Sequence, residues 1–273
     1  MKVIIISKKD SRARAMAGDL NRRLTRYGAK SEIIENLHST SIKHADLAFV
    51  LGGDGTILRV AHALAGKDIP ILGVNFGRVG YLTSIEPEQL WPALELLITD
   101  QYHIDDRRML EVSLQKGKDT CLFEPALNDM VIKIISPQVV DIKLQINDRP
   151  ARYLRGDGII CATPTGSTAY SLSAGGPVVD TDLPVLIVTP ICAQLRTLPP
   201  LVVSADAQIK LQIISNHSTC LAMDGEVKAT LDRGDKVTVS QSAVVTHIIR
   251  IDSHRLRSGP TDNYLRNLEL VSL

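Results

Sequence analysis

An apolar run meets a cluster of glycines at Phe49-Val50-Leu51-Gly52-Gly53-Asp54-Gly55-Thr56-Ile57-Leu58. Residues 47–51 predict a buried strand, and the apolar pattern that begins at Thr56 predicts a helix. Glycines between a strand and a helix allow positive φ angles and leave room for a ligand. The first turn of the helix offers free N–H groups and the positive end of its dipole. The turn is therefore a candidate phosphate site.

Asp54 lies inside this candidate anion site, where its negative charge would repel a phosphate. A bridging cation, or the transfer of a proton from a hydroxyl group to Asp54, would remove the conflict. Both uses indicate phosphoryl transfer from a magnesium nucleotide. The alternative is a tight turn with an exposed Asp, since Gly-Gly-Asp-Gly is also a common turn sequence. The stretch lacks the Lys of a Walker loop and is not Gly-x-Gly-x-x-Gly.

The composition fits a soluble globular protein of one large domain or two ordinary ones. Of its 273 residues, 44% are hydrophobic and 22% are charged. The net charge of +1 provides no global field for nucleic acid or an acidic membrane. Aromatic residues make up only 4%, which argues against base-stacking platforms for single-stranded nucleic acid.

The cysteines and the N-terminus indicate a cytoplasmic protein. Cys121, Cys161, Cys192 and Cys220 are widely spaced, without a Cys-x-x-Cys pair or a His at metal-binding spacing. We expect reduced thiols, mostly buried. The apolar run near Met1 is too short for a signal peptide, and no uncharged apolar stretch approaches the length of a membrane span.

Strands and helices alternate over the first hundred residues. We expect strands at residues 3–6, 31–34, 47–51 and 69–74, and helices at 11–27, 57–65 and 87–98. This order predicts an α/β domain with a parallel sheet and a ligand crevice at the carboxyl ends of its strands. Asp54 and Asn75 both lie at such ends.

After about Tyr102 the sequence becomes a series of short apolar or alternating runs. We expect strands at residues 110–114, 130–134, 139–146, 159–162, 186–189, 201–203, 209–214, 220–223, 236–240 and 244–251. Turn residues separate them, which predicts a mostly antiparallel β domain. The apolar stretch 264–273 is expected to return to the first domain.

Two further segments carry candidate ligand groups. Asn128 and Asp129 precede a strand and suit paired ribose hydroxyls, but an Asx turn that opens the strand explains them as well. Residues 163–168 form a loop rich in hydroxyl groups, and 167–174 are expected to form a helix ended by Gly175-Gly176. Its N-terminus would be a second site for a polar ligand, beside which Tyr170 could stack on a base. The alternative is a structural strand–turn–helix.

Together these blocks resemble the NAD kinases, which make NADP from NAD with ATP or inorganic polyphosphate. The similar blocks are Gly52–Thr56, Asn75–Thr83, Asn128-Asp129, Asp157–Gly176, Pro190-Ile191-Cys192 and Asp224-Gly225-Glu226. The first block is shared with lipid kinases and phosphofructokinases and is weakly specific. The block Thr-Pro-Thr-Gly-Ser-Thr-Ala-Tyr at 163–170 is highly specific.

The resemblance implies an α/β plus all-β fold class. Residues 1–102 would form a phosphofructokinase-like α/β domain with a parallel sheet that binds the phosphate donor. Residues 103–252 would form a β-sandwich that binds NAD and mediates oligomerisation, and residues 253–273 would return to the first domain. NAD would lie in the crevice between the two domains.

The resemblance also assigns residues. Asp54 matches the catalytic aspartate that orients or deprotonates the adenosine-ribose 2′-hydroxyl. The implied NAD-binding residues are Asp54, Gly55, Tyr81, Asn128, Asp129, Arg155, Asp157, Thr168, Ala169, Tyr170, Ser173 and Asp224. The implied donor-binding residues are Gly52, Gly53, Gly55, Thr56 and Asn75. Mg²⁺ or another divalent cation is expected through the nucleotide phosphates, with no protein ligand assigned. The expected partners are NAD, ATP or polyphosphate, and other copies of this chain in a homodimer or homotetramer, without nucleic acid or membrane.

Three sites in the sequence depart from the family's usual residues. Asp129 replaces the commoner Glu and is one methylene shorter, Tyr81 replaces Phe, and Ala193-Gln194-Leu195 replaces Pro-His-Ser. The shorter Asp129 and the altered loop at Ala193-Gln194 leave open a catalytically weak NAD-binding sensor. The shared first block leaves open a lipid kinase of the diacylglycerol or sphingosine type, although no apolar acceptor groove is visible in the sequence.

Overall fold

The computed structural model describes residues 1–35, 37, 42, 44–77, 80–194 and 198–251. The chain divides into two compact units, each described here by itself. The first, called the N-terminal unit, consists of Met1–Arg107 and the described residues from Val245 onward. The second, called the β unit, is Arg108–Val244.

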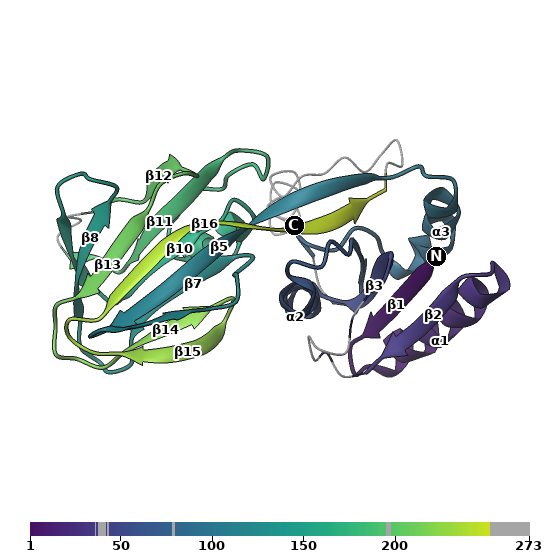
Figure 1. Cartoon of the computed structure of the whole chain (residues 1–273), viewed down its shortest axis with the longest axis horizontal. Helices are drawn as coiled ribbons and strands as arrows, with labels where there is room; N and C mark the ends of the chain where they lie inside the picture. Colours follow the sequence, from purple (N-terminus) through teal and green to yellow (C-terminus); the bar gives the residue numbers. More distant parts are fainter. Residues whose placement is uncertain (36, 38–41, 43, 78–79, 195–197, 252–273) are drawn as a thin grey trace, which may run out of the picture. The chain divides into compact units, whose positions relative to one another are not determined.

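A parallel sheet forms the centre of the N-terminal unit (Figure 1). Its strands lie in the order β2 (Lys30–Ile34), β1 (Lys2–Ser7), β3 (Leu47–Gly52) and β4 (Ile71–Asn75). The end of β16 (Lys236–Arg250) lies beside β4 and pairs in parallel through Ile248 and Ile71. Strands β1, β3 and β4 carry almost continuous apolar side chains because both faces of the sheet are covered there, whereas the edge strand β2 is mostly exposed. The predicted α/β domain with a parallel sheet is confirmed.

Helices cover the two faces of this sheet. Helix α1 (Ser11–Arg26) and helix α3 (Leu90–Ile98, after the 3₁₀ turn η1, Pro87–Gln89) share one core cluster with Phe49, Leu51 and Leu72. Helix α2 (Asp54–Leu64) lies on the other face, because a Cβ on Gly73 would approach Cδ1 of Ile57 to 2.5 Å. Strand residues alternate between the faces, so the two helix layers enclose the sheet.

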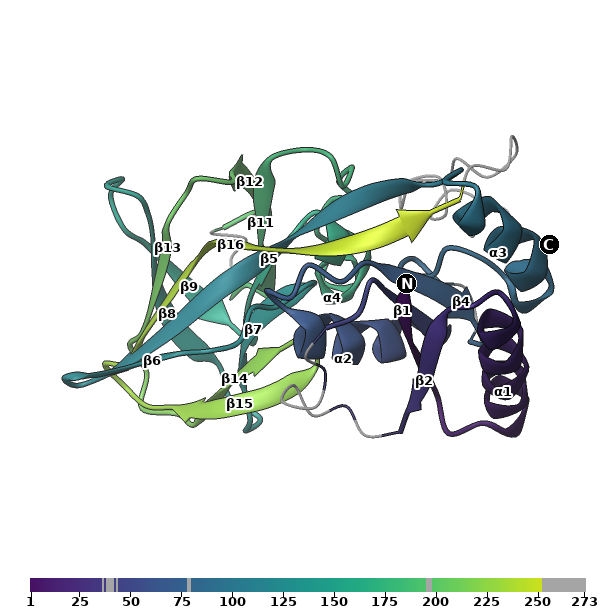
Figure 2. The same ribbon diagram turned by 45° about the vertical axis from the view of Figure 1, so that its right-hand side comes forward.

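The β unit contains a six-stranded antiparallel sheet. The strand order is β12 (Leu201–Ser204), β11 (Val185–Ile191), β10 (Gly158–Ala162), β7 (Asp129–Ile134), β14 (Thr219–Met223) and β15 (Glu226–Leu231). In a second set, β13 (Ile209–Ile213) pairs with β16 and β8 (Val140–Ile146), and β8 pairs with β9 (Arg152–Gly156). Strands β5 (His103–Lys116) and β6 (Asp119–Leu122) form a hairpin (Figure 2).

One apolar core joins the two sets of strands in the β unit. Met130, Ile159 and Leu221 of the six-stranded sheet belong to the same buried cluster as Ile142 and Leu211 of the second set. The opposite face of the six-stranded sheet is also covered, since Ile160 and Ile187 pack with Val179. The predicted β-sandwich is confirmed, and with it the predicted fold class.

Several elements differ from the prediction, and strands β6, β9 and β15 were not predicted at all. Helix α2 begins at Asp54, three residues before the predicted start. Residues 236–240 and 244–251 were expected as two strands, but β16 is continuous over Lys236–Arg250. The predicted helix at 167–174 is wrong: a 3₁₀ turn, η2 (Thr165–Thr168), and a four-residue helix, α4 (Tyr170–Ser173), are separated by Ala169, whose ψ of −131° is not helical.

The expectation for residues 253–273 lies outside the described residues. The functions assigned to the predicted domains, donor binding for 1–102 and NAD binding with oligomerisation for 103–252, stay predictions.

Candidate functional site

The glycine turn after β3 allows close packing. Gly52, Gly53 and Gly55 do not have positive φ angles, so the expected left-handed backbone is wrong. A Cβ on Gly52 would instead lie 2.4 Å from Oγ1 and 2.6 Å from Cβ of the buried Thr56. Gly53 is the N-cap of α2 and provides no side-chain acceptor. The first turn of α2 therefore starts tightly against the strand without a side chain covering it, as a phosphate site requires.

The carboxylate of Asp54 is held by two backbone amides. Oδ2 accepts a hydrogen bond from the N–H of Tyr81 at 3.0 Å, and Oδ1 accepts one from the N–H of Leu82 at 3.1 Å. Residues 80–82 can approach Asp54 because Gly80 has no side chain. A Cβ there would lie 2.1 Å from Oγ1 of Thr83 and 3.2 Å from Oδ1 of Asp54. Asp54 is half-buried and fixed in orientation, which suits a carboxylate that must meet a hydroxyl group at one angle.

Three strand ends meet at the same edge of the N-terminal unit. The backbone N–H of Lys8, just after β1, donates to Leu51 O at 2.9 Å, and the N–H of Phe76, just after β4, donates to Gly52 O at 3.0 Å. Nζ of Lys8 donates to Phe76 O. The half-buried ammonium group therefore lies beside the glycine turn and adds positive charge to the candidate phosphate site.

The side chain of Asn75, a predicted donor-binding residue, shapes this edge. Its Oδ1 accepts from the N–H of Gly77 at 2.9 Å, and its Nδ2 donates to Glu86 at 3.0 Å. These bonds hold the turn after β4 against Gly53, since a Cβ on Gly77 would lie 3.4 Å from Cα of Gly53. The geometry gives Asn75 a positioning role at the site.

Asp224 organises the predicted acidic pair in the β unit. Its carboxylate accepts hydrogen bonds from the backbone N–H groups of Leu127 at 2.7 Å, Asn128 at 2.8 Å and Asp129 at 2.9 Å. The backbone N–H of Asp224 donates to Asp129 O at 3.0 Å. A carboxylate holding three amides fixes the chain that enters β7 and so fixes the directions of Asn128 and Asp129.

Asp129 is a buried carboxyl group, with 5% of its surface exposed. Burial, together with the negative charge of Asp224, raises the pKa of Asp129 to about 7. Near neutral pH its side chain can therefore be a hydrogen-bond donor as well as an acceptor. Asp129, which is one methylene shorter than the usual Glu, is the first residue of β7, and its environment disfavours its charge.

The hydroxyl-rich segment at 163–171 is mostly structural. Oγ1 of Thr163 donates to Leu127 O at 2.6 Å and accepts from the N–H of Gly166 at 3.0 Å. Oγ of Ser167 bonds with the backbone of Val179, and Oγ of Ser171 bonds with Thr189 at 2.8 Å. With only four-residue helical turns there, the expected second helix N-terminus does not exist. Of the predicted residues in this segment, Thr168, Ala169 and Tyr170 are half-buried and Ser173 is exposed.

A second group of predicted residues lines a cavity of the β unit. The cavity has a volume of about 620 Å³, and its walls include Arg155, Asp157, Lys133 and His217. Lys133 also lies over the ring of Tyr170, with Nζ 5.6 Å from the ring centre. The hydrogen bond with Tyr170 raises the pKa of Lys133. This cavity can therefore present cationic and acidic groups to one polar ligand.

Comparisons with known proteins match both units. The family model described as the ATP-NAD kinase N-terminal domain matches residues 5–102, and the one described as the ATP-NAD kinase C-terminal domain matches residues 127–251. An NAD kinase of Geobacter metallireducens is 40% identical over 84% of this chain and 79% of its own length. The chain belongs to the NAD kinase family. An NAD kinase of Heliobacterium modesticaldum is 39% identical over 88% of each chain.

Solved structures agree with this family assignment. The structure titled as an NAD kinase from Archaeoglobus fulgidus in complex with ATP is 27% identical, with a TM-score of 0.78 over 96% of this chain and 99% of that one. Yeast NADH kinase complexed with NADH has a TM-score of 0.86 over 100% of this chain and 88% of that one. At 22% identity the yeast enzyme shows the fold alone. The resemblance found in the sequence is confirmed, and the NAD kinase family is one of phosphotransferases.

Within this NAD kinase family member, the predicted residues gather in each unit separately. In the N-terminal unit, Asp54, Tyr81 and the glycine turn come together. In the β unit, Asp129 and Asp224 form one group, while Arg155 and Asp157 line the cavity. The described residues contain no cluster of three or more His, Cys, Asp or Glu side chains that could hold a metal ion. Among the described helices, none is long and apolar enough to cross a membrane.

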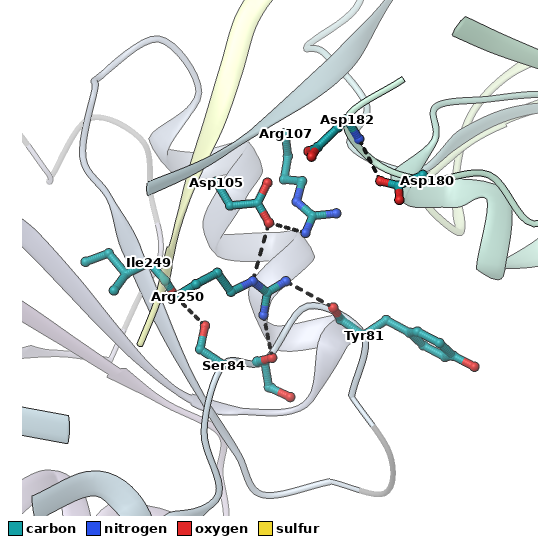
Figure 3. A network of polar contacts seen from close by, with 9 residues as sticks. Tyr81, Ser84, Asp105, Arg107, Asp180, Asp182, Ile249 and Arg250 are labelled. Carbon is teal, nitrogen blue, oxygen red and sulfur yellow. Dashed lines mark hydrogen bonds and ion pairs between the residues drawn. The ribbon is translucent and has the colours of Figure 1, made fainter. Parts of the chain in front are cut away.

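Sequence reasoning missed several residues at these sites. Lys8 directly follows the first strand, as Asp54 and Asn75 follow theirs, so strand order could have identified it. Lys133 and Arg250 carry no such signal, because the sequence places them inside the predicted strands 130–134 and 244–251. Arg250, in β16, donates to the carbonyl oxygens of the segment that holds Asp54 (Figure 3).

Proposed function

We propose that this chain transfers the terminal phosphoryl group of ATP, or of polyphosphate, to the adenosine-ribose 2′-hydroxyl of NAD and so makes NADP in the cytoplasm. The observation that carries the proposal is the carboxylate of Asp54 at the first turn of α2, held by the N–H groups of Tyr81 and Leu82 in a chain of this family. The ATP complex of the Archaeoglobus fulgidus relative supports ATP as the donor.

Asp54 orients the attacking hydroxyl group in this mechanism. The N–H groups of Tyr81 and Leu82 hold the orientation of the carboxylate, which accepts a hydrogen bond from the 2′-hydroxyl. As the bond from the ribose oxygen to the terminal phosphorus forms, the bond from that phosphorus to its bridging oxygen breaks, and ADP or a shortened polyphosphate leaves. The hydroxyl proton passes to Asp54 late in the step and then to solvent.

The glycine turn and Lys8 bind the donor phosphates. The uncovered first turn of α2 presents the backbone N–H of Gly55, while the N–H of Thr56 donates to Gly53 O at 2.8 Å. The ammonium group of Lys8 adds charge at the same edge. A divalent cation such as Mg²⁺ would neutralise phosphate charge when bound. Asp54 suits it as a single carboxylate ligand, since Mg²⁺ is commonly held by one or two carboxylates plus substrate phosphates.

The β unit recognises NAD in the proposed function. Asn128 and Asp129, fixed by Asp224, offer amide and carboxyl groups for ribose hydroxyls. Tyr81 of the N-terminal unit offers a ring to the adenine. Arg155 and Asp157, with Thr168, Ala169, Tyr170 and Ser173, offer contacts for the rest of the dinucleotide.

The proposal is tested by NADP formation from purified protein, NAD and Mg²⁺, with ATP and polyphosphate in separate reactions. We expect NADP in at least one reaction, and the reaction that forms it identifies a usable donor. If neither forms NADP while NAD still binds, the chain is an NAD-binding sensor and the proposed reaction is wrong.

A further inference from the structure

The guanidinium group of Arg250 donates hydrogen bonds to residues 81–83, the segment whose backbone amides hold the carboxylate of Asp54. Its Nη1 donates to Thr83 O at 2.8 Å, and its Nη2 donates to Tyr81 O at 3.4 Å (Figure 3). Both carbonyl groups belong to residues 81–83 of the N-terminal unit. A planar guanidinium group can hold two acceptors in one fixed geometry, which a lysine ammonium group cannot do in the same way.

The other side of this segment faces the catalytic aspartate. The N–H groups of Tyr81 and Leu82 donate to the two carboxylate oxygens of Asp54 at 3.0 and 3.1 Å. Tyr81 therefore donates its N–H to Asp54 and offers its C=O to Arg250. A displacement of the segment away from Arg250 would change the direction of the Asp54 carboxylate.

Arg250 is itself fixed within the N-terminal unit. Its Nε donates to Asp105 of β5 at 3.4 Å, and Asp105 also pairs with Arg107. Its side chain is 16% exposed and that of Asp105 is 15% exposed. Next to Arg250, the carbonyl oxygen of Ile249 accepts a hydrogen bond from Oγ of Ser84 at 2.5 Å. Strand β16 therefore also contacts the residue that directly follows residues 81–83.

Arg250 remains charged around neutral pH. Burial, with the like charge of Arg107 adding to it, lowers the pKa of Arg250 to about 10. The charge strengthens its bonds to the two carbonyl oxygens because the surroundings contain little water.

We propose that Arg250 is a positioning residue for the phosphoryl transfer: it holds residues 81–83 so that their amides aim the carboxylate of Asp54 at the ribose hydroxyl. The inference rests on the role of Asp54 in the proposed function. It predicts an effect on turnover with little effect on NAD binding, since no contact between Arg250 and substrate is required.

The first test compares Arg250→Gln and Arg250→Lys with the exposed Arg14→Gln as a control. We expect Arg250→Gln to lower kcat by about 10- to 100-fold, the loss typical of a misplaced catalytic group, with KM for NAD within about threefold of wild type. Arg250→Lys should keep part of kcat, because a lysine retains the positive charge but cannot hold both carbonyl oxygens in the fixed geometry of a guanidinium group. Arg14→Gln should match wild type. Wild-type kcat in a folded Arg250→Gln variant would overturn the inference.

The second test measures the segment directly and needs no turnover. Amide hydrogen exchange and amide resonances of Tyr81 and Leu82 are recorded for wild type, Arg250→Gln, Arg250→Lys and Asp54→Asn. We expect faster exchange at both amides in Arg250→Gln, with resonances that move toward those of Asp54→Asn, and a smaller change in Arg250→Lys. Unchanged amides in both Arg250 variants would overturn the inference, whereas an inactive wild-type protein with the expected amide changes would contradict the proposed function alone.

Discussion

The raised pKa of Asp129 makes the stability of the β unit depend on pH. Its pKa rises from 3.8 to about 7 on folding, mainly because the carboxyl group is buried and also because of Asp224. Between these two pH values the folded chain keeps the proton and the unfolded chain loses it. The free energy of unfolding therefore falls as the pH rises through this window, and this loss is complete above about pH 7.

Asp129→Asn should remove this pH dependence. About two pKa units of the shift lie between pH 5 and pH 7. From pH 5 to pH 8 the free energy of unfolding of the variant should therefore rise by about 3 kcal/mol relative to that of wild type. Urea unfolding at both pH values measures the difference. The exposed Asp148→Asn is the matched control and should show no such gain. Equal curves for wild type and Asp129→Asn at both pH values would contradict the shifted pKa.

Asp54 should matter for turnover far more than for NAD binding. Asp54→Asn keeps a side chain that can accept a hydrogen bond from one backbone amide, but it loses the charge and the group that takes the hydroxyl proton. We expect kcat to fall by about 10²–10⁴-fold, while the affinity for NAD from isothermal titration changes only a few fold. Near-normal turnover of the folded variant would exclude the assigned role, and Asp148→Asn again serves as the control.

Among the elements, the turn between β10 and α4 depends on backbone packing. A Cβ on Gly166 would lie 2.1 Å from O, 2.5 Å from C and 2.8 Å from Cα of Asn128, all of them backbone atoms. The backbone must shift to accept it, and the shift would disturb the residue that the proposed function assigns to ribose. The glycine in this specific sequence block is therefore explained by packing.

Gly166→Ala should lower the free energy of unfolding by about 1–3 kcal/mol or more, the usual cost of overpacking. Gly55→Ala is the matched control, because a Cβ there has no neighbour within 4 Å and an alanine suits the helix α2. It should be neutral or stabilising by up to about 1 kcal/mol. Urea unfolding of both variants gives the comparison, and equal stabilities would contradict the packing role of Gly166.

The periodicity of the sequence predicted most elements because long apolar runs leave few alternatives. The strands of the parallel sheet and helix α1 were found almost to the residue. Strands β6, β9 and β15 were missed, because at least half of the residues in each are exposed and do not form an apolar run. The start of α2 was missed because glycines are poor helix formers, yet here tertiary packing places Asp54 and Gly55 in the helix.

The sequence predicted only part of the candidate site, because some of its residues are positioned by contacts between distant parts of the chain. Residues that lie at strand ends, such as Asp54 and Asn75, follow from strand order and chemistry. The roles of Asp224 and Arg250 depend on hydrogen bonds to backbone groups about 95 and 167 residues away, which no local pattern contains. The hydroxyl groups at 163–171 suggested a ligand site, but the structure uses many of them to pack a short turn.

For the whole molecule, we expect self-association. The net charge of +1 provides little repulsion between copies. Strand β15 ends the order of the six-stranded sheet, and its Val227 is 67% exposed. An end strand with an exposed apolar side chain is a template for pairing with another chain.

Sedimentation should therefore detect a species heavier than the 29.8 kDa monomer. Val227→Lys should shift the distribution toward the monomer, because a lysine disfavours pairing at a sheet edge. Ile98→Lys, at the end of α3 in the N-terminal unit, is the control and should leave the mass unchanged. A monomeric wild-type protein would contradict the expected homodimer or homotetramer.

Binding of NAD should stabilise the whole chain independently of catalysis. A ligand that binds only the folded state at 100 times its Kd raises the free energy of unfolding by about 2.7 kcal/mol. We expect this gain from NAD in wild type and in Asp54→Asn alike, measured by urea unfolding, since the variant loses turnover rather than affinity. Vesicles of anionic phospholipid that contain diacylglycerol should neither stabilise the protein nor sediment with it. Stabilisation by the vesicles, together with none by NAD, would instead favour a lipid kinase, the reading that the shared Gly-Gly-Asp-Gly block alone leaves open.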